Sequence, residues 1–462
     1  MKYDLVYKTA TTPYFPICLM GSNYSRNFKT LSGVDKPAEP VVAVIDHGTV
    51  SWFFPFSLRK LAALVVSRIV TSLTLVGNIK RQEKILSSQL VKLTNFNLRC
   101  FYKGKTLTPV GRRYLERLFE VYHKYAYFVD APGFLFQLYY IEVLKAKLFK
   151  HWRSDSRKQK EIKFNLLLSS VQLTNYEKYL SDLIRGATSG RINKPRLVKK
   201  YFWLVHDYLG DIIDEKYLTA QLKEIKSEVD EYRSQLQAAR RRISEINKIT
   251  AALPVGLRRE MNNIHQLMYL YNERKKEVIN KVNIFIRQLV TWRYPHYSLS
   301  QLRKIYQLAP KEIISLLAGD KIDNWPQRDK SAVYLMADGQ ISSGGRKYLL
   351  LLKDTVSKAL KGLPASPGKA VGQASIILNI SHIPKFKKGT ILVAPFTNVN
   401  YLPIMRAAKA IITETGGLTS HAAIVARELN KPCIVGVKNL IASLCDGDRI
   451  EVNADKGLIK KL

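Results

Sequence analysis

The sequence has 462 residues, of which 46% are hydrophobic, and it holds 74 lysines and arginines against 37 aspartates and glutamates, a formal net charge of +37. This length and hydrophobic content exclude a disordered chain and predict two or three globular domains. So basic a chain attracts polyanions such as nucleic acid, but its basic residues are spread over the whole length without an arginine-rich arm or a nucleic-acid motif. Nucleic-acid binding is therefore a secondary interpretation.

The cysteines and the apolar segments indicate a reducing compartment and no membrane span. The chain has four cysteines: Cys18, Cys100, Cys433 and Cys445. They form no Cys-x-x-Cys pair, which favours free thiols over a disulfide framework or a metal site. The apolar stretch 51–75 is interrupted by three basic residues, so it predicts an amphipathic helix, and the first residues lack the apolar run of a signal peptide. We expect a cytoplasmic protein with no bound metal.

Residues 1–55 predict an irregular N-terminal segment. A tract rich in proline, glycine and serine precedes Val41-Val-Ala-Val-Ile45, which is typical of a strand or a buried extended run. Asp46-His47-Gly48 follows directly. A histidine after a strand can be catalytic, but this single triplet is a weak signal, and a turn is the preferred interpretation.

Residues 56–351 predict a large, mostly α-helical region. Apolar residues recur there at spacings of three and four. The dense aromatic residues are expected to fill a helical core, with a ligand pocket lined by some of them as the alternative. A long helical hairpin is expected over about 215–292, with its turn at residues 253–254, and the three consecutive arginines 240–242 are interpreted as a solvated face. Residues 352–362 predict a linker.

Residues 363–462 change to short alternating strands and helices, which predict one compact domain. Strands are expected near 370–378, 390–395, 409–413, 432–437, 448–453 and 457–460. Helices are expected near 400–408, 421–430 and 438–444. The fold class is therefore multidomain, α + α/β: a helical N-terminal region followed by a β/α domain.

A glycine turn and one histidine join a strand to a helix within this last domain. Gly416 and Gly417 break the strand. Thr419 or Ser420 can cap the helix that follows. His421 then lies in the first helical turn, where free backbone N–H groups and the helix dipole favour an anion and a neutral, nucleophilic imidazole. A lone histidine at such a place is more often an ordinary polar residue of a helix. The neighbouring residues therefore decide whether His421 is a functional histidine.

Those neighbours form the run Gly-Gly-Leu-Thr-Ser-His-Ala-Ala-Ile-Val-Ala-Arg-Glu at 416–428, followed by Pro-Cys-Ile-Val-Gly at 432–436. This pattern closely resembles the phosphohistidine loop of the PEP-utilising enzymes. The family includes PEP synthase, pyruvate phosphate dikinase, enzyme I of the sugar phosphotransferase system and rifampin phosphotransferase. The resemblance implies that 363–462 is a mobile, swivelling domain, whose histidine takes a phosphoryl group at one site and delivers it at another.

The resemblance also implies roles for single residues of the loop. His421 is the expected phosphohistidine. Thr419 and Ser420 are expected as oxyanion ligands beside it, and Gly416 and Gly417 as the residues that shape the phosphate loop.

Three arginines have less direct roles. Arg427 lies nearly two helical turns after the histidine, so it could steady the phosphoryl group, anchor the helix or meet the partner domain. Segments within 261–351 resemble the helical region that precedes the mobile domain in PEP-synthase-like and rifampin-phosphotransferase-like proteins. In rifampin phosphotransferase the comparable region binds the acceptor. Arg274 and Arg328 could therefore contact phosphate or substrate here, or they could form structural ion pairs.

Two departures from the family pattern concern the phosphoryl donor. Phe396-Thr397-Asn398-Val399-Asn400 stands where family members often carry an acidic residue, which puts metal-assisted transfer or domain docking in doubt. No glycine-rich loop of the ATP-grasp kind and no P-loop is recognised, and a PEP-binding barrel would begin where the sequence stops. The resemblance therefore implies ATP or PEP as the donor, with Mg²⁺, on a separate ATP-grasp or PEP-binding subunit.

We expect a phosphotransferase-type protein that carries a phosphoryl group on a histidine between such a donor site and an acceptor, which could be a small molecule. Two alternatives stay open. A non-enzymatic binding module could retain the swivelling fold and bind polyanions through its basic helical region, with salt-sensitive binding that His421→Ala leaves unchanged. A rifampin-phosphotransferase-like enzyme could bind a small-molecule acceptor among the aromatic helices of residues 56–210.

Overall fold

The structure is a computed structural model of the 462-residue chain. It describes residues 3–10, 41–46, 49–55, 57–94, 101–104, 106–125, 129, 136, 140–205, 212–298, 301–302, 308, 310–320, 331–337, 340–343, 360–378, 380–397, 401–418, 420–437 and 440–462. Within these ranges, no helix combines the length and the apolar character that crossing a bilayer requires.

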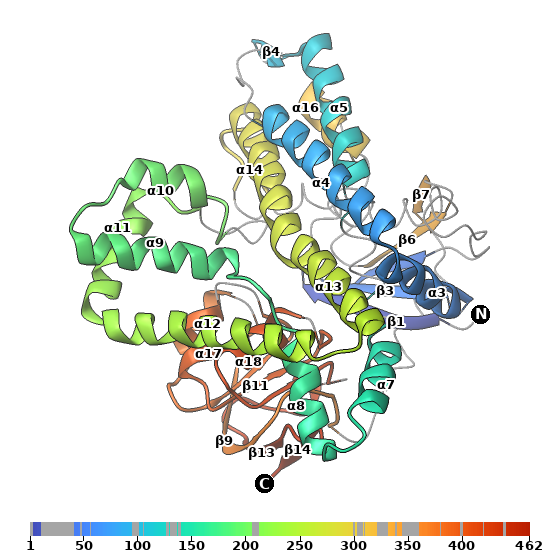
Figure 1. Cartoon of the computed structure of the whole chain (residues 1–462). Coiled ribbons are helices and arrows are strands. Elements are labelled where there is room, and N and C mark those ends of the chain that lie inside the picture. The colour runs from blue at the N-terminus through green and yellow to red at the C-terminus, as the bar shows by residue number, and fades with distance from the viewer. Residues whose placement is uncertain are drawn as a thin grey trace.

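A five-stranded antiparallel sheet joins the N-terminus to the end of the helical region (Figure 1). Its strands, in spatial order, are β1 Tyr3–Ala10, β3 Thr49–Pro55, β2 Val41–Asp46, β6 Ser331–Ala337 and β7 Gln340–Ser343. The structure thus contains the expected strand near 41–45, but it also forms strands where an irregular segment and helices were expected. Valine, threonine, tryptophan and phenylalanine fill β3, and such β-branched and aromatic residues favour a paired, pleated backbone.

Helices make up most of the described chain between the two parts of this sheet. Their bounds are α3 Ser57–Thr71, α4 Leu73–Thr94, α5 Pro109–Tyr125, α7 Ile141–His151, α8 Arg157–Leu167, α9 Asn175–Ser189, α10 Lys194–Tyr201, α11 Glu215–Ser227, α12 Val229–Ala251, α13 Val255–Tyr269, α14 Lys275–Arg293 and α16 Pro310–Ala318. A short hairpin of β4 Tyr102–Lys103 and β5 Thr106–Leu107 precedes α5. Tyr122, Tyr125 and Tyr140 are almost completely buried, so these aromatic side chains fill a helical core.

The helices over 215–292 are shorter than those of the expected hairpin. Glu228, with φ −128° and ψ 29°, separates α11 from α12, and Pro254 precedes α13. Leu270–Arg274 forms a π-helix, η4, between α13 and α14. Figure 1 shows α13 and α14 leaving α12 at a wide angle and running along α4. A long antiparallel hairpin therefore stays a prediction.

The C-terminal domain is built on a seven-stranded sheet. Its strands, in spatial order, are β14 Leu458–Lys461, β13 Arg449–Asn453, β9 Lys369–Ile376, β10 Ile391–Ala394, β11 Ala410–Thr413, β12 Cys433–Val435 and β8 Leu363–Ser366. Its helices are η7 Ile380–Lys385, α17 Leu402–Ala407, α18 His421–Glu428 and α19 Leu440–Ser443. Strands β9 to β12 are parallel and the outer strands are antiparallel. The expected β/α domain after a helical region is confirmed.

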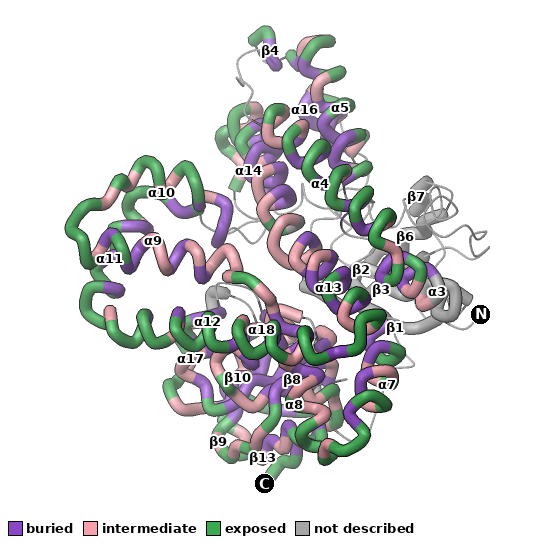
Figure 2. The backbone as a smooth tube through the Cα atoms, in the orientation of Figure 1, coloured by how far each residue is buried: buried purple, intermediate pink, exposed green. Residues whose placement is uncertain are grey.

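The central strands of this sheet are buried on both faces, as in other parallel sheets covered by helices. Ile391 and Ile412 pack in one cluster with residues of α19. Leu392 and Ile411 pack on the other face, in a cluster that continues through α17 and α18 into the helical region. Helix α18 contacts β8, β11 and β12 on one side and α12 on the other (Figures 1 and 2). The helical region therefore covers the face of the domain that carries α18.

Candidate active site

The candidate site lies where the chain passes from β11 to α18. Strand β11 ends at Thr413, and α18 begins at His421. Ser420 is the N-cap, and its Oγ accepts a hydrogen bond from the backbone N–H of Ala423 at 3.4 Å, as expected of a capping serine. His421 therefore lies at the end of α18 where the free N–H groups and the helix dipole favour negative charge.

The loop before His421 requires glycine at position 416. Gly416 has φ +114°, and a Cβ on it would lie 2.9 Å from Oγ of Ser420. Gly436 approaches from the next loop, with φ +69°, and a Cβ there would lie 3.0 Å from the carbonyl oxygen of Gly416. Gly417 has open space where a Cβ would be, and its carbonyl oxygen accepts the Ser420 N–H at 2.9 Å. Of the two glycines predicted to shape the loop, Gly416 has the steric reason.

Thr397 is a site residue that the sequence analysis missed. Its Oγ1 lies 2.9 Å from Nδ1 of His421, and its side chain is buried. When Nδ1–H donates to this hydroxyl, the lone pair of the neutral ring lies on Nε2, which is then the nucleophilic nitrogen. The segment 396–400 lacks the carboxylate that family members often carry, and its Thr397 places a hydroxyl beside the histidine.

The surroundings of His421 keep its imidazole neutral. Burial lowers the pKa of His421 well below its usual value, and the positive charge of Lys276 lowers this pKa further. A neutral imidazole has a free lone pair at neutral pH, as nucleophilic attack on phosphorus requires.

Arg427 does not point at the phosphohistidine position but holds α18 in place. Its Nε donates to Oγ of Ser169, which follows α8, at 3.2 Å, and its Nη1 donates to the carbonyl oxygen of Ala365 in β8 at 3.1 Å. The guanidinium is buried, and burial lowers the pKa of Arg427 to about 10. Of the roles considered for Arg427, the contacts support an anchor of α18 that also meets the helical region.

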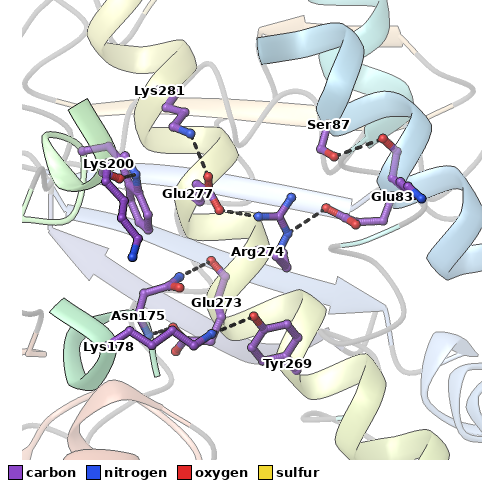
Figure 3. A network of polar contacts seen from close by, with 12 residues as sticks. Glu83, Ser87, Asn175, Lys178, Lys200, Tyr269, Glu273, Arg274, Glu277 and Lys281 are labelled. Atoms are coloured by element: carbon purple, nitrogen blue, oxygen red, sulfur yellow. Dashed lines mark hydrogen bonds and ion pairs between the residues drawn. The ribbon is translucent and has the colours of Figure 1, made fainter. Parts of the chain in front are cut away.

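Arg274 lies in an ion-pair network between α4 and α14 (Figure 3). Its Nε donates to Oε1 of Glu83 at 3.1 Å, and its Nη1 donates to Oε2 of Glu277. Lys281 donates to the other oxygen of Glu277 at 2.7 Å. Of the two interpretations for Arg274, these contacts support the structural ion pair. The other two predicted residues, Thr419 and Arg328, lie outside the described residues.

Charged groups lie around the π-helix η4 and the start of α14. Oε2 of Glu273 accepts a hydrogen bond from the backbone N–H of Asn175 at 2.6 Å, and Lys178 donates to the hydroxyl of Tyr269 at 3.2 Å (Figure 3). Lys276 follows η4 and is exposed, and its charge reaches His421. Single π-turns are frequent at functional sites, so this turn is a candidate part of the site.

Metal-binding groups do not gather in the described part of the chain. Among those residues, no three histidine, cysteine, aspartate or glutamate side chains are placed so that they could hold a metal ion. The described partners of His421 are a hydroxyl and a lysine charge, which do not fit Mg²⁺, since this ion prefers carboxylate oxygens.

Comparison with known proteins assigns the domain that carries this site. Residues 386–457 match the family described as "PEP-utilising enzyme, mobile domain". The probable phosphoenolpyruvate synthase of Pyrococcus horikoshii is 39% identical over 168 residues, which are 33% of this chain and 20% of that protein.

Two rifampicin phosphotransferases are also similar. The protein of Bacillus cereus is 28% identical over 252 residues, 46% of this chain and 28% of that protein. The protein of Bacillus subtilis is 32% identical over 167 residues, 34% of this chain and 19% of that protein. The chain thus spans between 19% and 28% of the length of these three relatives.

Proposed function

Because the chain belongs to the PEP-utilising enzyme family through its mobile domain, we propose that it is a phosphotransfer protein that carries a phosphoryl group on His421. The pair formed by Thr397 and Nδ1 of His421, at the N-terminus of α18, is the observation that carries this proposal. It leaves Nε2 as the nucleophile of a neutral ring, and it places the incoming phosphoryl oxygens beside backbone N–H donors.

Two displacements at phosphorus make up the reaction. In loading, the Nε2 lone pair attacks the phosphorus of the donor, an N–P bond forms, and the P–O bond to the donor breaks with its electron pair on the leaving oxygen. In delivery, an acceptor hydroxyl attacks the same phosphorus, the N–P bond breaks, and the hydroxyl proton passes to solvent. Mg²⁺ that arrives with the donor would neutralise phosphoryl charge.

The donor is ATP or PEP, bound outside the described residues, on a separate ATP-grasp or PEP-binding subunit. The names of the relatives support these donors, since they are PEP synthases and rifampicin phosphotransferases. The acceptor is a hydroxyl-bearing small molecule on the helical region. The position of η4 and Lys276 toward His421 supports this placement.

Phosphohistidine formation tests the proposal. The purified chain would be incubated with labelled ATP and, separately, with labelled PEP, each with and without lysate of the host. We expect acid-labile, base-stable label that His421→Ala abolishes and that His382→Ala, a histidine of η7 in the same domain, leaves unchanged. A requirement for lysate would place the donor site on another chain.

The same experiment decides against the proposal if the wild-type chain takes no label under any condition. In that case the binding module becomes the better interpretation. Its support is the net charge of +37, and its expected property is polyanion binding that falls steeply with salt and does not change in His421→Ala.

A further inference from the structure

Three arginines connect the mobile domain to the helical region. Besides Arg427, which donates to Ser169, they are Arg406 of α17 and Arg242 of α12. Arg406 donates to Oε1 of Gln235 in α12, and its guanidinium lies 4.8 Å from the ring centre of Tyr232 on the same helix. Helix α12 therefore supplies polar side chains that contact both α17 and α18.

Arg242 lies at the centre of this surface, between carboxylates of both parts. Its Nη2 donates to Oε1 of Glu177 in α9 at 3.0 Å, and its Nη1 lies 3.5 Å from Oε1 of Glu428 in α18. All three side chains are at least 85% buried. The same Glu177 accepts the backbone N–H of Thr174 with its other oxygen, so the capping box of α9 fixes its position.

The burial of Arg242 corrects the interpretation of residues 240–242 as a solvated face. Arg240 and Arg241 are exposed as expected, but Arg242 is only 8% exposed. It follows Ala239 by three residues and precedes Ile246 by four, so it lies on the buried stripe of α12. A charge on that stripe is stable only with partners, and these partners come from sequence positions 65 residues before it and 186 after it.

Among the described residues, four buried side-chain atoms at this interface have no protein hydrogen-bond partner. They are Nε of Arg242, Nε of Arg406, Nη2 of Arg427 and Oε1 of Glu428, of which the last has only the 3.5 Å ion pair with Arg242. A permanent interior pairs nearly all such atoms, because each unpaired one costs about 1–3 kcal/mol.

We propose that Arg242 is a latch residue: it holds Glu177 and Glu428 together and thereby docks the mobile domain on α12, with His421 facing η4. The inference that Arg242 docks the mobile domain is supported by the contacts alone. The inference that docking helps to deliver a phosphoryl group rests on the proposed function. Arg242 is a positioning residue, because it contacts neither the histidine nor a substrate. Opening the latch frees the domain to reach a donor on another chain.

Hydrogen exchange of the full chain tests the latch with a matched pair of variants. Arg242→Gln is compared with Arg241→Gln, which removes an exposed arginine from the neighbouring position of α12. We expect exchange in α18 and in the adjoining part of α12 to rise at least about tenfold in Arg242→Gln, with α4 and α14 unchanged and Arg241→Gln identical to wild type. Wild-type exchange in Arg242→Gln, or a rise spread over all helices, would overturn the latch.

A second variant approaches the same contact from the mobile domain. Glu428→Ala removes the partner without altering the helical region, so it remains informative if Arg242→Gln does not fold. It should raise exchange on α12 as Arg242→Gln does, and the double variant should add little to either single change. Full additivity would mean that the two residues act separately and would overturn the latch.

Labelling of His421 separates this inference from the proposed function. Arg242→Gln should still take label from the donor, because loading needs the free domain, but it should pass label to an acceptor more slowly. If the wild-type chain also takes no label, the proposed phosphotransfer function is overturned. The hydrogen-exchange result then tests by itself whether Arg242 docks the mobile domain.

Discussion

Thr397 contacts Nδ1 of His421, and when this nitrogen carries the ring proton, Nε2 is the nitrogen that can react. Replacing the threonine by valine keeps its shape but removes the hydroxyl that lies 2.9 Å from Nδ1. We expect Thr397→Val to slow loading of His421 about two- to thirteenfold, since a hydrogen bond of this kind contributes about 0.5–1.5 kcal/mol and 1.36 kcal/mol is a factor of ten. Single-turnover labelling from the donor measures this rate.

Thr397→Ser is the matched control, because serine keeps the hydroxyl. It should load at close to the wild-type rate. Nitrogen NMR of the ring should show the Nδ1–H tautomer in wild type and Thr397→Ser, and more of the Nε2–H tautomer in Thr397→Val. Equal rates and equal tautomers in all three proteins would mean that the threonine does not orient the ring.

Single residues of the site differ in how far the sequence could predict them. His421 and Gly416 lie within one continuous run, so local patterns of glycine, hydroxyl and helix start identify them. Thr397 lies 24 residues before the histidine and is brought to it because β10 and β11 are parallel neighbours, with Ala394 beside Thr413. Because strand pairing brings Thr397 to the histidine, no local sequence pattern predicts this contact. The contact of Arg427 with Ser169 also joins distant segments and was not predictable for the same reason.

At the scale of elements, the turn from β11 to α18 depends on a left-handed glycine. In Gly416→Ala the new Cβ would lie 2.9 Å from Oγ of Ser420, at a φ of +114° that side chains rarely adopt. We expect this change to lower the free energy of unfolding of the mobile domain by about 1–3 kcal/mol. Urea denaturation of the full chain, followed by a signal from the mobile domain, measures it.

Gly417→Ala is the control for this turn, because a Cβ there meets nothing within 4 Å. It should change stability by less than about 0.5 kcal/mol. Equal losses of stability in Gly416→Ala and Gly417→Ala would contradict a loop conformation in which only Gly416 lacks room for a Cβ.

Elements formed by neighbouring residues were predictable, and those formed across long distances were not. The helices and the short strands after residue 363 follow from apolar spacing that each segment carries itself. The first sheet pairs β2 with β6, so Val42 lies beside Leu335 although almost 300 residues separate them. Such pairing cannot be read from a local pattern, which is why 1–55 was expected to be irregular.

At the scale of the whole molecule, the carboxyl group of Glu428 makes docking depend on pH. Burial raises the pKa of Glu428 to about 8, Glu177 and Glu273 also raise it, and Arg242 and Arg427 oppose them. We expect the carboxyl group to be exposed in the undocked domain and to have the usual glutamate pKa of 4.5 there. The docked chain therefore binds one proton more than the undocked chain between these two pH values.

The sign of the effect follows from this proton. The contribution of Glu428 to docking is complete below about pH 4.5 and is lost as the pH rises through 8, because docking then requires either proton uptake or a buried carboxylate. We expect X-ray scattering of the full chain in solution to show a larger radius of gyration at pH 8.5 than at pH 6. Glu428→Gln, which stays neutral and keeps its hydrogen-bonding oxygen, should remove this difference. Glu245→Gln, which changes an exposed residue of α12, should leave the difference unchanged. If the difference persists in Glu428→Gln, another titratable group causes the pH dependence.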